Sequence, residues 1–177
     1  MGGTFVSAAI RLLTAPTGLV TVVAGANASQ LEPVVYAENA FLVQNPHPEE
    51  GQFSSLRVGL QDVLSRGRDV AVVTLVDRPP VRPPTLQALL AAFESAIDRG
   101  KWAVVPEFNG KHGHPIVIGR EMIEAFLRAP ARSNAREVRH AHQEFIEYVP
   151  LDDPLVTLNV DTPEEYAALA GSAAISK

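Results

Sequence analysis

A short apolar segment that ends on a carboxylate is the part of this chain best suited to chemistry. Residues 70–76 are mostly apolar and β-branched, the pattern of an interior parallel strand buried on both faces. Asp77 follows directly, and Pro79 and Pro80 then end the strand because proline cannot continue a sheet ladder. The sequence thus predicts a carboxylate at the C-terminal edge of a sheet, where open α/β folds bind ligands. A turn or capping role for Asp77 is the alternative.

A second carboxylate, Asp161, lies just before a predicted helix that Thr162 and Pro163 begin. Asn159 stands two residues earlier and would face the same side of a strand. Oxygen ligands from these residues, together with Asp77, would suit a Mg²⁺ ion that keeps several waters and gathers substrate phosphates. The alternative is that Asp161 only complements the helix dipole.

A proline-containing loop, residues 45–51, leads into a predicted helix that carries Ser54 and Ser55 near its start. Free backbone N–H groups at such a helix end suit an anion or the polar edge of a ligand. An ordinary serine N-cap is the simpler interpretation.

His112 and His114 lie two residues apart in a loop that contains Gly110 and Gly113. They would bind a metal only with further nitrogen or sulfur ligands, and the sequence offers none nearby. The glycines favour instead a tight turn, or a backbone that approaches a ligand closely.

A basic cluster occupies the segment after residue 127, with the members Arg128, Arg132, Arg136, Arg139 and His140. Its spacing is typical of a solvated helix face. Contact with a phosphorylated acceptor is the alternative.

Alternating strands and helices have to position these residues. Strands are predicted at 19–24, 40–43, 70–76, 102–105, 116–118, 145–149 and 155–160, and the main helices at 4–13, 54–65, 84–99, 120–128, 134–140 and from 162 onward. This alternation predicts one α/β domain over residues 1–177, with a mainly parallel sheet covered by helices on both faces.

Composition narrows the functional classes. The 177 residues suffice for one substantial core, and a net charge of −5 argues against a nucleic-acid partner. The absence of cysteine excludes disulfides and thiol chemistry. We see no signal peptide and no apolar run near the roughly 20 residues that span a bilayer. We therefore expect a cytoplasmic protein without a membrane partner.

Four segments in this order resemble the MobA-like nucleotidyltransferase family, which contains the molybdenum cofactor cytidylyl- and guanylyltransferases. They are NPHPEEGQFSSLRVGL (45–60), LVDRPPVRPPTLQALL (75–90), VVPEFNGKHGHPIVIGREM (104–122) and LNVDTPEEY (158–166). The resemblance implies a three-layer α/β/α Rossmann-like fold, similar to the nucleotide-diphospho-sugar transferases. It also implies Mg²⁺-dependent transfer of a nucleotidyl group, with CTP or GTP favoured, to a phosphorylated acceptor such as molybdopterin, with release of pyrophosphate.

The same resemblance assigns roles to individual residues. It implies that Asp77 and Asp161 are catalytic metal ligands, assisted by Asn159. Ser54 and Ser55, with Asp77, would bind the nucleoside triphosphate. The remaining set, His112, His114 and Arg136, would lie on the acceptor side.

One family feature has no counterpart in this sequence. The family opens with a strand and a Gly-rich loop that wraps the triphosphate, whereas residues 1–6 resemble the stretch just after that loop. A start placed too late is our preferred explanation, and a real loss is the alternative. We expect the sheet to show a gap between the strands at 19–24 and 70–76, and the chain as given to be inactive or nearly so.

Two other functions stay open at this point. The chain could be a nucleotide-binding pseudoenzyme, or a partner in cofactor maturation, that keeps a pocket without turnover. It could also be a sugar-phosphate-binding α/β domain in which Asp77 is structural. The last alternative predicts that Mg²⁺ has no effect on nucleotide binding.

Overall fold

Helices and strands alternate along the chain, as the sequence predicts. The computed structural model describes residues 4–173. The helices are α1 (Phe5–Thr17), α2 (Ala28–Ala37), α3 (Gln52–Ser65), α4 (Pro83–Ile97), α5 (Arg120–Arg128), α6 (Ala135–Ala141) and α7 (Pro163–Ala173). The strands are β1 (Thr21–Ala24), β2 (Phe41–Gln44), β3 (Val70–Val73), β4 (Ala103–Phe108), β5 (Lys111–His112), β6 (Ile116–Gly119) and β7 (Ile146–Pro150), with short 3-10 turns η1 (Pro48–Glu50), η2 (Gln143–Phe145) and η3 (Pro154–Val156). None of the described helices is long and apolar enough to cross a membrane.

The strands form an α/β fold, which confirms the predicted class. β1 and β2 make a parallel pair, and β3, β6, β4 and β5 follow one another in a second sheet, where β7 pairs in parallel with β4. β6 runs antiparallel to both β3 and β4, so β3, β4 and β7 share one direction, and β5 and β6 are the antiparallel members of the second sheet. The short hairpin between β4 and β6 explains this direction, because a parallel return needs a crossover of about a dozen residues or more.

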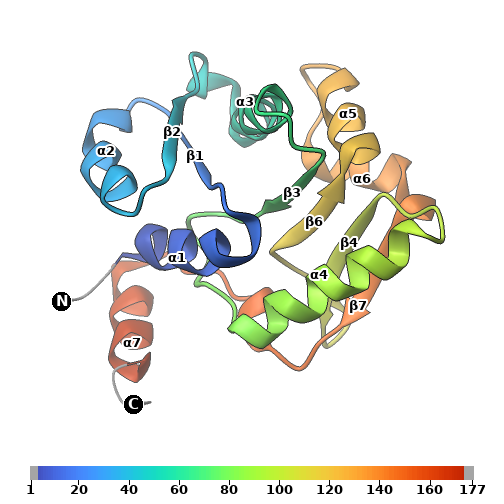
Figure 1. Cartoon of the computed structure of the whole chain (residues 1–177). Helices are drawn as coiled ribbons and strands as arrows, with labels where there is room; N and C mark the ends of the chain where they lie inside the picture. Colours follow the sequence, from blue (N-terminus) through green and yellow to red (C-terminus); the bar gives the residue numbers. More distant parts are fainter. Residues whose placement is uncertain (1–3, 174–177) are drawn as a thin grey trace.

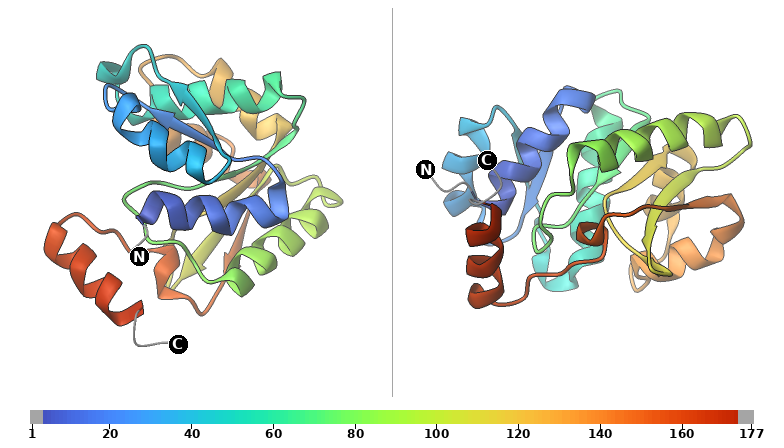
Figure 2. Two further views of the ribbon diagram at one scale, coloured as in Figure 1. Left: turned by 60° about the vertical axis from the view of Figure 1, so that its left-hand side comes forward. Right: turned by 90° about the horizontal axis from the view of Figure 1, so that it is seen from below.

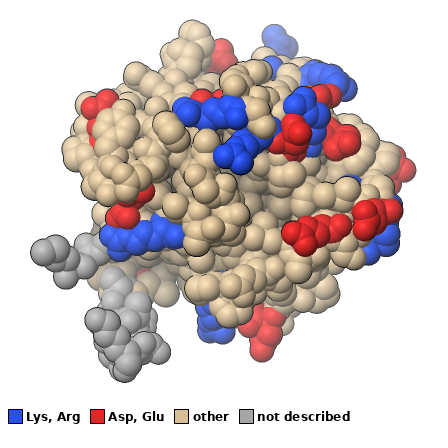
Figure 3. All heavy atoms as spheres, in the orientation of Figure 1, with Lys and Arg blue, Asp and Glu red and all other residues tan. Residues whose placement is uncertain are grey.

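The sheet layer is broken between β1 and β3. Among the described residues no ladder joins these two strands, and Figure 1 shows them on the two sides of the break. Val70 of β3 is 44% exposed, as expected for an edge strand without a neighbour. The break lies where the sequence predicted a gap. Charged side chains gather on the side of α3 and α5 in Figure 3.

Helix α1 spans the break on one face. Leu13 belongs to a core cluster with Leu86 and Val156, on the side of the larger sheet. Ile10 packs with Val35 of α2, on the side of β1 and β2. One helix therefore supplies both half-cores with apolar side chains.

Helix α3 spans the break on the other face. A Cβ atom on Gly59 would come within 2.9 Å of Val23 Cγ2, so α3 lies directly against β1. The Thr21 hydroxyl also donates a hydrogen bond of 2.9 Å to Asp62 of α3. Leu60 packs in the largest core cluster with Ala71 of β3. Helix packing, rather than a ladder, thus holds the two sheets together.

Two predicted strands are shorter or absent. β3 ends at Val73, so Asp77 lies in a turn four residues later. The strand predicted at 155–160 is wrong, because η3 and a loop occupy this segment. The buried Asp153 carboxylate explains the difference: it accepts hydrogen bonds from the Thr85 hydroxyl at 2.6 Å and from the Leu155 N–H at 3.1 Å, which replaces strand pairing with a local turn.

The C-terminal helix α7 lies beside the start of α1, as both views of Figure 2 show. The rings of Phe5 and Tyr166 are 4.5 Å apart between centroids. This contact places the loop before α7 on the side of the molecule where the chain begins.

Candidate functional site

A backbone hydrogen bond brings the two predicted metal-binding segments together. The Val160 N–H donates to the Asp77 carbonyl at 2.9 Å, so the turn after β3 lies against the residue that precedes Asp161. Both Asp77 and Asp161 are exposed, as is Asn159. Within the described part of the chain neither carboxylate pairs with a Lys, Arg or His. Both therefore remain free to bind a cation.

Thr162 is the N-cap of α7, and the carboxylate that completes its capping box comes from Glu165 and not from Asp161. The Glu165 carboxylate accepts hydrogen bonds from the N–H groups of Asp161 at 2.9 Å and Thr162 at 3.1 Å. These two bonds lower the pKa of Glu165. The Thr162 hydroxyl in turn accepts from the Glu165 N–H at 3.2 Å, which completes a capping box and confirms Thr162 as the predicted N-cap. The capping role is thus taken, and the Asp161 side chain is left for another use.

The oxygen donors available at this edge fit a hard cation. Asp77, Asp161 and Asn159 supply carboxylate and amide oxygens, which Mg²⁺ prefers. No group of three or more His, Cys, Asp or Glu residues in the described chain could hold a metal without further ligands. The donor set therefore fits an ion that keeps waters or binds substrate phosphates, and does not fit a closed structural site.

Ser54 and Ser55 are held by a buried asparagine. Asn45, only 2% exposed, donates from Nδ2 to the Ser54 hydroxyl at 2.8 Å and to the Ser55 hydroxyl at 3.0 Å. Its Oδ1 accepts from the His47 N–H at 2.9 Å. The N-cap residue of α3 is Gly51, without a side-chain cap, so the serine N-cap interpretation is wrong. The two hydroxyls shape the loop between β2 and α3.

The histidine loop approaches another segment of the chain. The Gly113 N–H donates to the Pro106 carbonyl at 2.9 Å, and a Cβ atom on Gly113 would lie 1.8 Å from the Val156 carbonyl oxygen. Glycine is therefore required for close backbone contact. Exposed His112 stacks on Tyr148, with ring centroids 4.0 Å apart.

His114 is half-buried beside two arginines, with its Nδ1 atom out of reach of solvent. The backbone N–H of His114 donates to the Val156 carbonyl at 2.8 Å, and Arg78 Nη1 donates to the same oxygen at 3.3 Å. The pKa of His114 is lowered from 6.5 to about 3. Burial is the largest cause, and the positive charges of Arg78 and Arg139 act in the same direction. His114 is thus a neutral imidazole at neutral pH.

Arg139 shares this environment. Burial lowers its pKa, Tyr148 acts in the opposite direction, and the charges of Arg136 and Arg78 lower it again. Arg136 itself is exposed at the rim. The solvated helix face predicted for the basic cluster is therefore wrong for Arg139. The sequence pattern indicated His114 and Arg136 but missed Arg78, whose only signal is its position directly after Asp77.

The family assignment follows from the sequence as a whole. The MobA-like NTP transferase domain matches residues 1–146. The chain belongs to this family. It is therefore a nucleotidyltransferase, and an enzyme, by family. The matched range includes Asp77 and the serine, histidine and arginine candidates, while Asn159 and Asp161 lie beyond it.

Solved structures with the same fold cover most of this MobA-like domain. A manganese complex of Rv0371c from Mycobacterium tuberculosis is 21% identical, with 97% of this chain and 88% of that chain covered and a TM-score of 0.73. A cytidylyltransferase from Leptospira borgpetersenii is 13% identical over 100% of this chain and 78% of that chain, with a TM-score of 0.78. Molybdopterin-guanine dinucleotide biosynthesis protein A from Archaeoglobus fulgidus is 18% identical over 94% and 85%, with a TM-score of 0.64. No curated protein matches the chain significantly.

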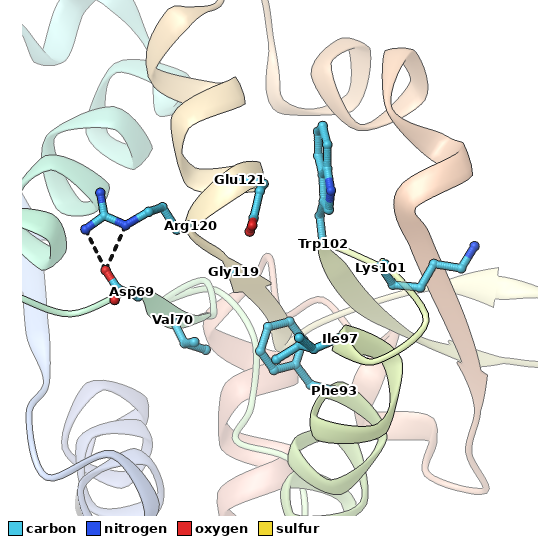
Figure 4. Close-up of a pocket in the computed structure, with 10 residues that line it drawn as sticks. Asp69, Val70, Phe93, Ile97, Lys101, Trp102, Gly119, Arg120 and Glu121 are labelled. Atoms are coloured by element: carbon cyan, nitrogen blue, oxygen red, sulfur yellow. Dashed lines mark hydrogen bonds and ion pairs between the residues drawn. The ribbon is translucent and has the colours of Figure 1, made fainter.

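One hollow of this MobA-like domain lies away from these residues. It has a volume of about 370 Å³ and is bordered by Asp69 and Val70 at the start of β3, by Phe93, and by Arg120 (Figure 4). Arg120 is paired with Asp69 there at 2.6 Å. Asp77 follows the opposite end of β3. The hollow and the candidate site are therefore at opposite ends of β3.

Proposed function

We propose that this domain transfers a nucleotidyl group from a nucleoside triphosphate to a phosphorylated acceptor and releases pyrophosphate, with Mg²⁺ as cofactor. The observation that carries the proposal is the pair of free carboxylates, Asp77 and Asp161, on segments joined by the hydrogen bond between Val160 and Asp77. Family membership supplies the reaction class.

In the proposed reaction an oxygen of the acceptor phosphate forms a bond to the α-phosphorus. The bond from that phosphorus to the bridging oxygen breaks, and pyrophosphate leaves with the electron pair. A bound Mg²⁺ would neutralise developing charge on the phosphates. Asp77, Asp161 and Asn159 would hold it, and the chain's main contribution is to position the reactants.

The nucleotide would lie along the loop between β2 and α3, which Ser54 and Ser55 shape. α3 leads into β3 through a four-residue connection, so the start of α3 and the end of β3 lie at the same edge. We propose CTP or GTP as the donor and molybdopterin as a candidate acceptor. Two structural relatives are named a cytidylyltransferase and a molybdopterin-guanine dinucleotide biosynthesis protein.

The broken sheet favours a second candidate, a nucleotide-binding protein with little or no turnover. β1 and β3 lie on the two sides of the break, and the proposed nucleotide site is bordered by the loop after β2, the partner of β1, and by the turn after β3. A site whose two halves are joined only through helices can bind a nucleotide without aligning it for transfer. Binding and turnover therefore need separate measurements.

The decisive experiment is nucleotide titration by calorimetry with and without Mg²⁺. We expect Mg²⁺ to strengthen binding of CTP or GTP, and Asp77→Asn and Asp161→Asn to abolish that gain. Asp98→Asn is the matched control, because Asp98 is an exposed carboxylate at the far end of α4. Identical binding with and without Mg²⁺ would reject the metal site. Pyrophosphate release with each candidate acceptor then separates the enzyme from the non-catalytic protein.

A further inference from the structure

Three polar atoms are buried without a hydrogen-bond partner in the described structure, and they come from one cluster. They are Arg78 Nε, His114 Nδ1 and Arg139 Nε. We call Arg78, His114 and Arg139 the buried basic cluster after these buried atoms, although each of the three residues as a whole is half-buried. Its members come from the turn after β3, the loop between β5 and β6, and helix α6. Buried polar atoms normally have a partner, so three unpaired atoms in one cluster require an explanation.

The charge of the cluster is not balanced by the protein. None of the ion pairs in the described residues involves Arg78 or Arg139. Of the carboxylates on the adjoining elements, Glu107 lies 3.3 Å from His112, and Glu137 closes the capping box of α6. Asp77, next to Arg78 in the same turn, is exposed and forms no ion pair with Arg78 or Arg139 in the described structure. A third cation, Arg136, stands at the rim. Each of the two half-buried guanidinium groups keeps one Nε atom out of reach of solvent and without a partner, and an anionic ligand would supply that partner.

We propose that the buried basic cluster binds the phosphate monoester of the acceptor. Two guanidinium groups match the charge of a phosphate dianion, and their fixed N–H geometry suits phosphate oxygens. His114, which is neutral, can donate one hydrogen bond from a ring nitrogen without adding charge. The identification of this phosphate as the acceptor's rests on the proposed function, whereas the binding of phosphate itself does not.

The position of Arg78 connects this cluster with the metal site. Arg78 directly follows Asp77 in the same turn, and the loop that carries Asp161 is hydrogen-bonded to that turn through Val160. A phosphate in the cluster would thus lie next to the edge where the nucleotide phosphates gather. Guanidinium contacts would also keep this phosphate fully ionised, which is the form that attacks the α-phosphorus.

The test uses inorganic phosphate as the probe, in calorimetric titrations and thermal melting at constant ionic strength. We expect phosphate to bind and to raise the melting temperature more than chloride does. Arg139→Gln should weaken phosphate binding by about tenfold or more, the usual effect of losing a charged hydrogen bond. Arg139→Lys should keep part of the affinity. Arg132→Gln, at an exposed arginine of the loop before α6, is the matched control and should bind as the wild type does.

Melting without phosphate separates binding from a structural role. Arg139→Gln removes an unpaired half-buried cation, so its melting temperature should equal or exceed that of the wild type. A large loss of stability would mean that Arg139 holds the fold together and would overturn the proposal, as would equal phosphate affinity in Arg139→Gln and the wild type. If phosphate binds as expected while Mg²⁺ has no effect on nucleotide binding, the cluster stands and the proposed function fails.

Discussion

His114 should make the protein sensitive to mild acid. Burial, reinforced by Arg78 and Arg139, lowers its pKa from 6.5 to about 3 in the folded chain. Below about pH 6.5 the unfolded chain therefore binds a proton that the folded chain does not bind. Stability is at its full value above pH 6.5 and falls as the pH decreases toward 3. At pH 5 the loss from this group is about 2 kcal/mol, against a typical total of about 5–15.

Urea unfolding at pH 7 and pH 5, in buffers without phosphate, measures this effect. Trp102, the single tryptophan, stacks on Phe145 with ring centroids 3.9 Å apart and provides the fluorescence signal. With a slope of about 1–3 kcal/mol per M, a loss of about 2 kcal/mol moves the midpoint by about 1 M. His114→Gln should remove this part of the pH dependence, whereas His140→Gln, at an exposed histidine, should retain it. The reasoning is refuted if wild type and His114→Gln lose equal stability on acidification.

Three further changes test the geometry of the site. Gly113→Ala should cost about 1–3 kcal/mol, because its Cβ would lie 1.8 Å from the Val156 carbonyl oxygen; an unchanged melting temperature would contradict this close contact. Asn45→Ala should lower stability by about 1–3 kcal/mol in urea unfolding, since it removes the buried hydrogen bonds to Ser54 and Ser55. A chain extended upstream by a strand and Gly-rich loop should melt several degrees higher than residues 1–177 alone, because about 1 kcal/mol shifts a domain of this size by roughly 2–4 °C. Equal melting temperatures for the two chains would show that the sheet layer gains nothing from another strand.

The sequence predicted local features better than long-range ones. The start of the last helix was readable, because the N-cap residue Thr162 and the proline after it are neighbours in the sequence. The buried environment of His114 was not readable, because it is created by Arg78 and Arg139, which come from elements far apart in the chain. The turn at Asp153 was missed as well, because the Asp153 carboxylate is held by the Thr85 hydroxyl from a distant part of the chain.

Family resemblance and geometry contributed different parts of the candidate site. The pattern around Asp77 and Asp161 indicated a metal site, and the structure joins the two segments by one backbone hydrogen bond. The sequence left open whether Asp161 serves only the helix dipole. In the structure Thr162 and Glu165 form the capping box of α7, and the Asp161 side chain lies outside that box.

The break in the sheet divides the proposed nucleotide site between two half-structures. The loop shaped by Asn45 follows β2, whose partner β1 borders the break, and the turn with Asp77 follows β3 on the other side. The helices α1 and α3 span the break and hold these loops relative to one another, and side-chain packing is a softer constraint than a ladder of backbone hydrogen bonds. A ligand that contacts both loops therefore binds most tightly when the two loops are held at the distance that it spans. A strand placed in the break would favour the same arrangement, because it would pair with both β1 and β3. Each would strengthen the binding of the other, because thermodynamic coupling between two sites is reciprocal.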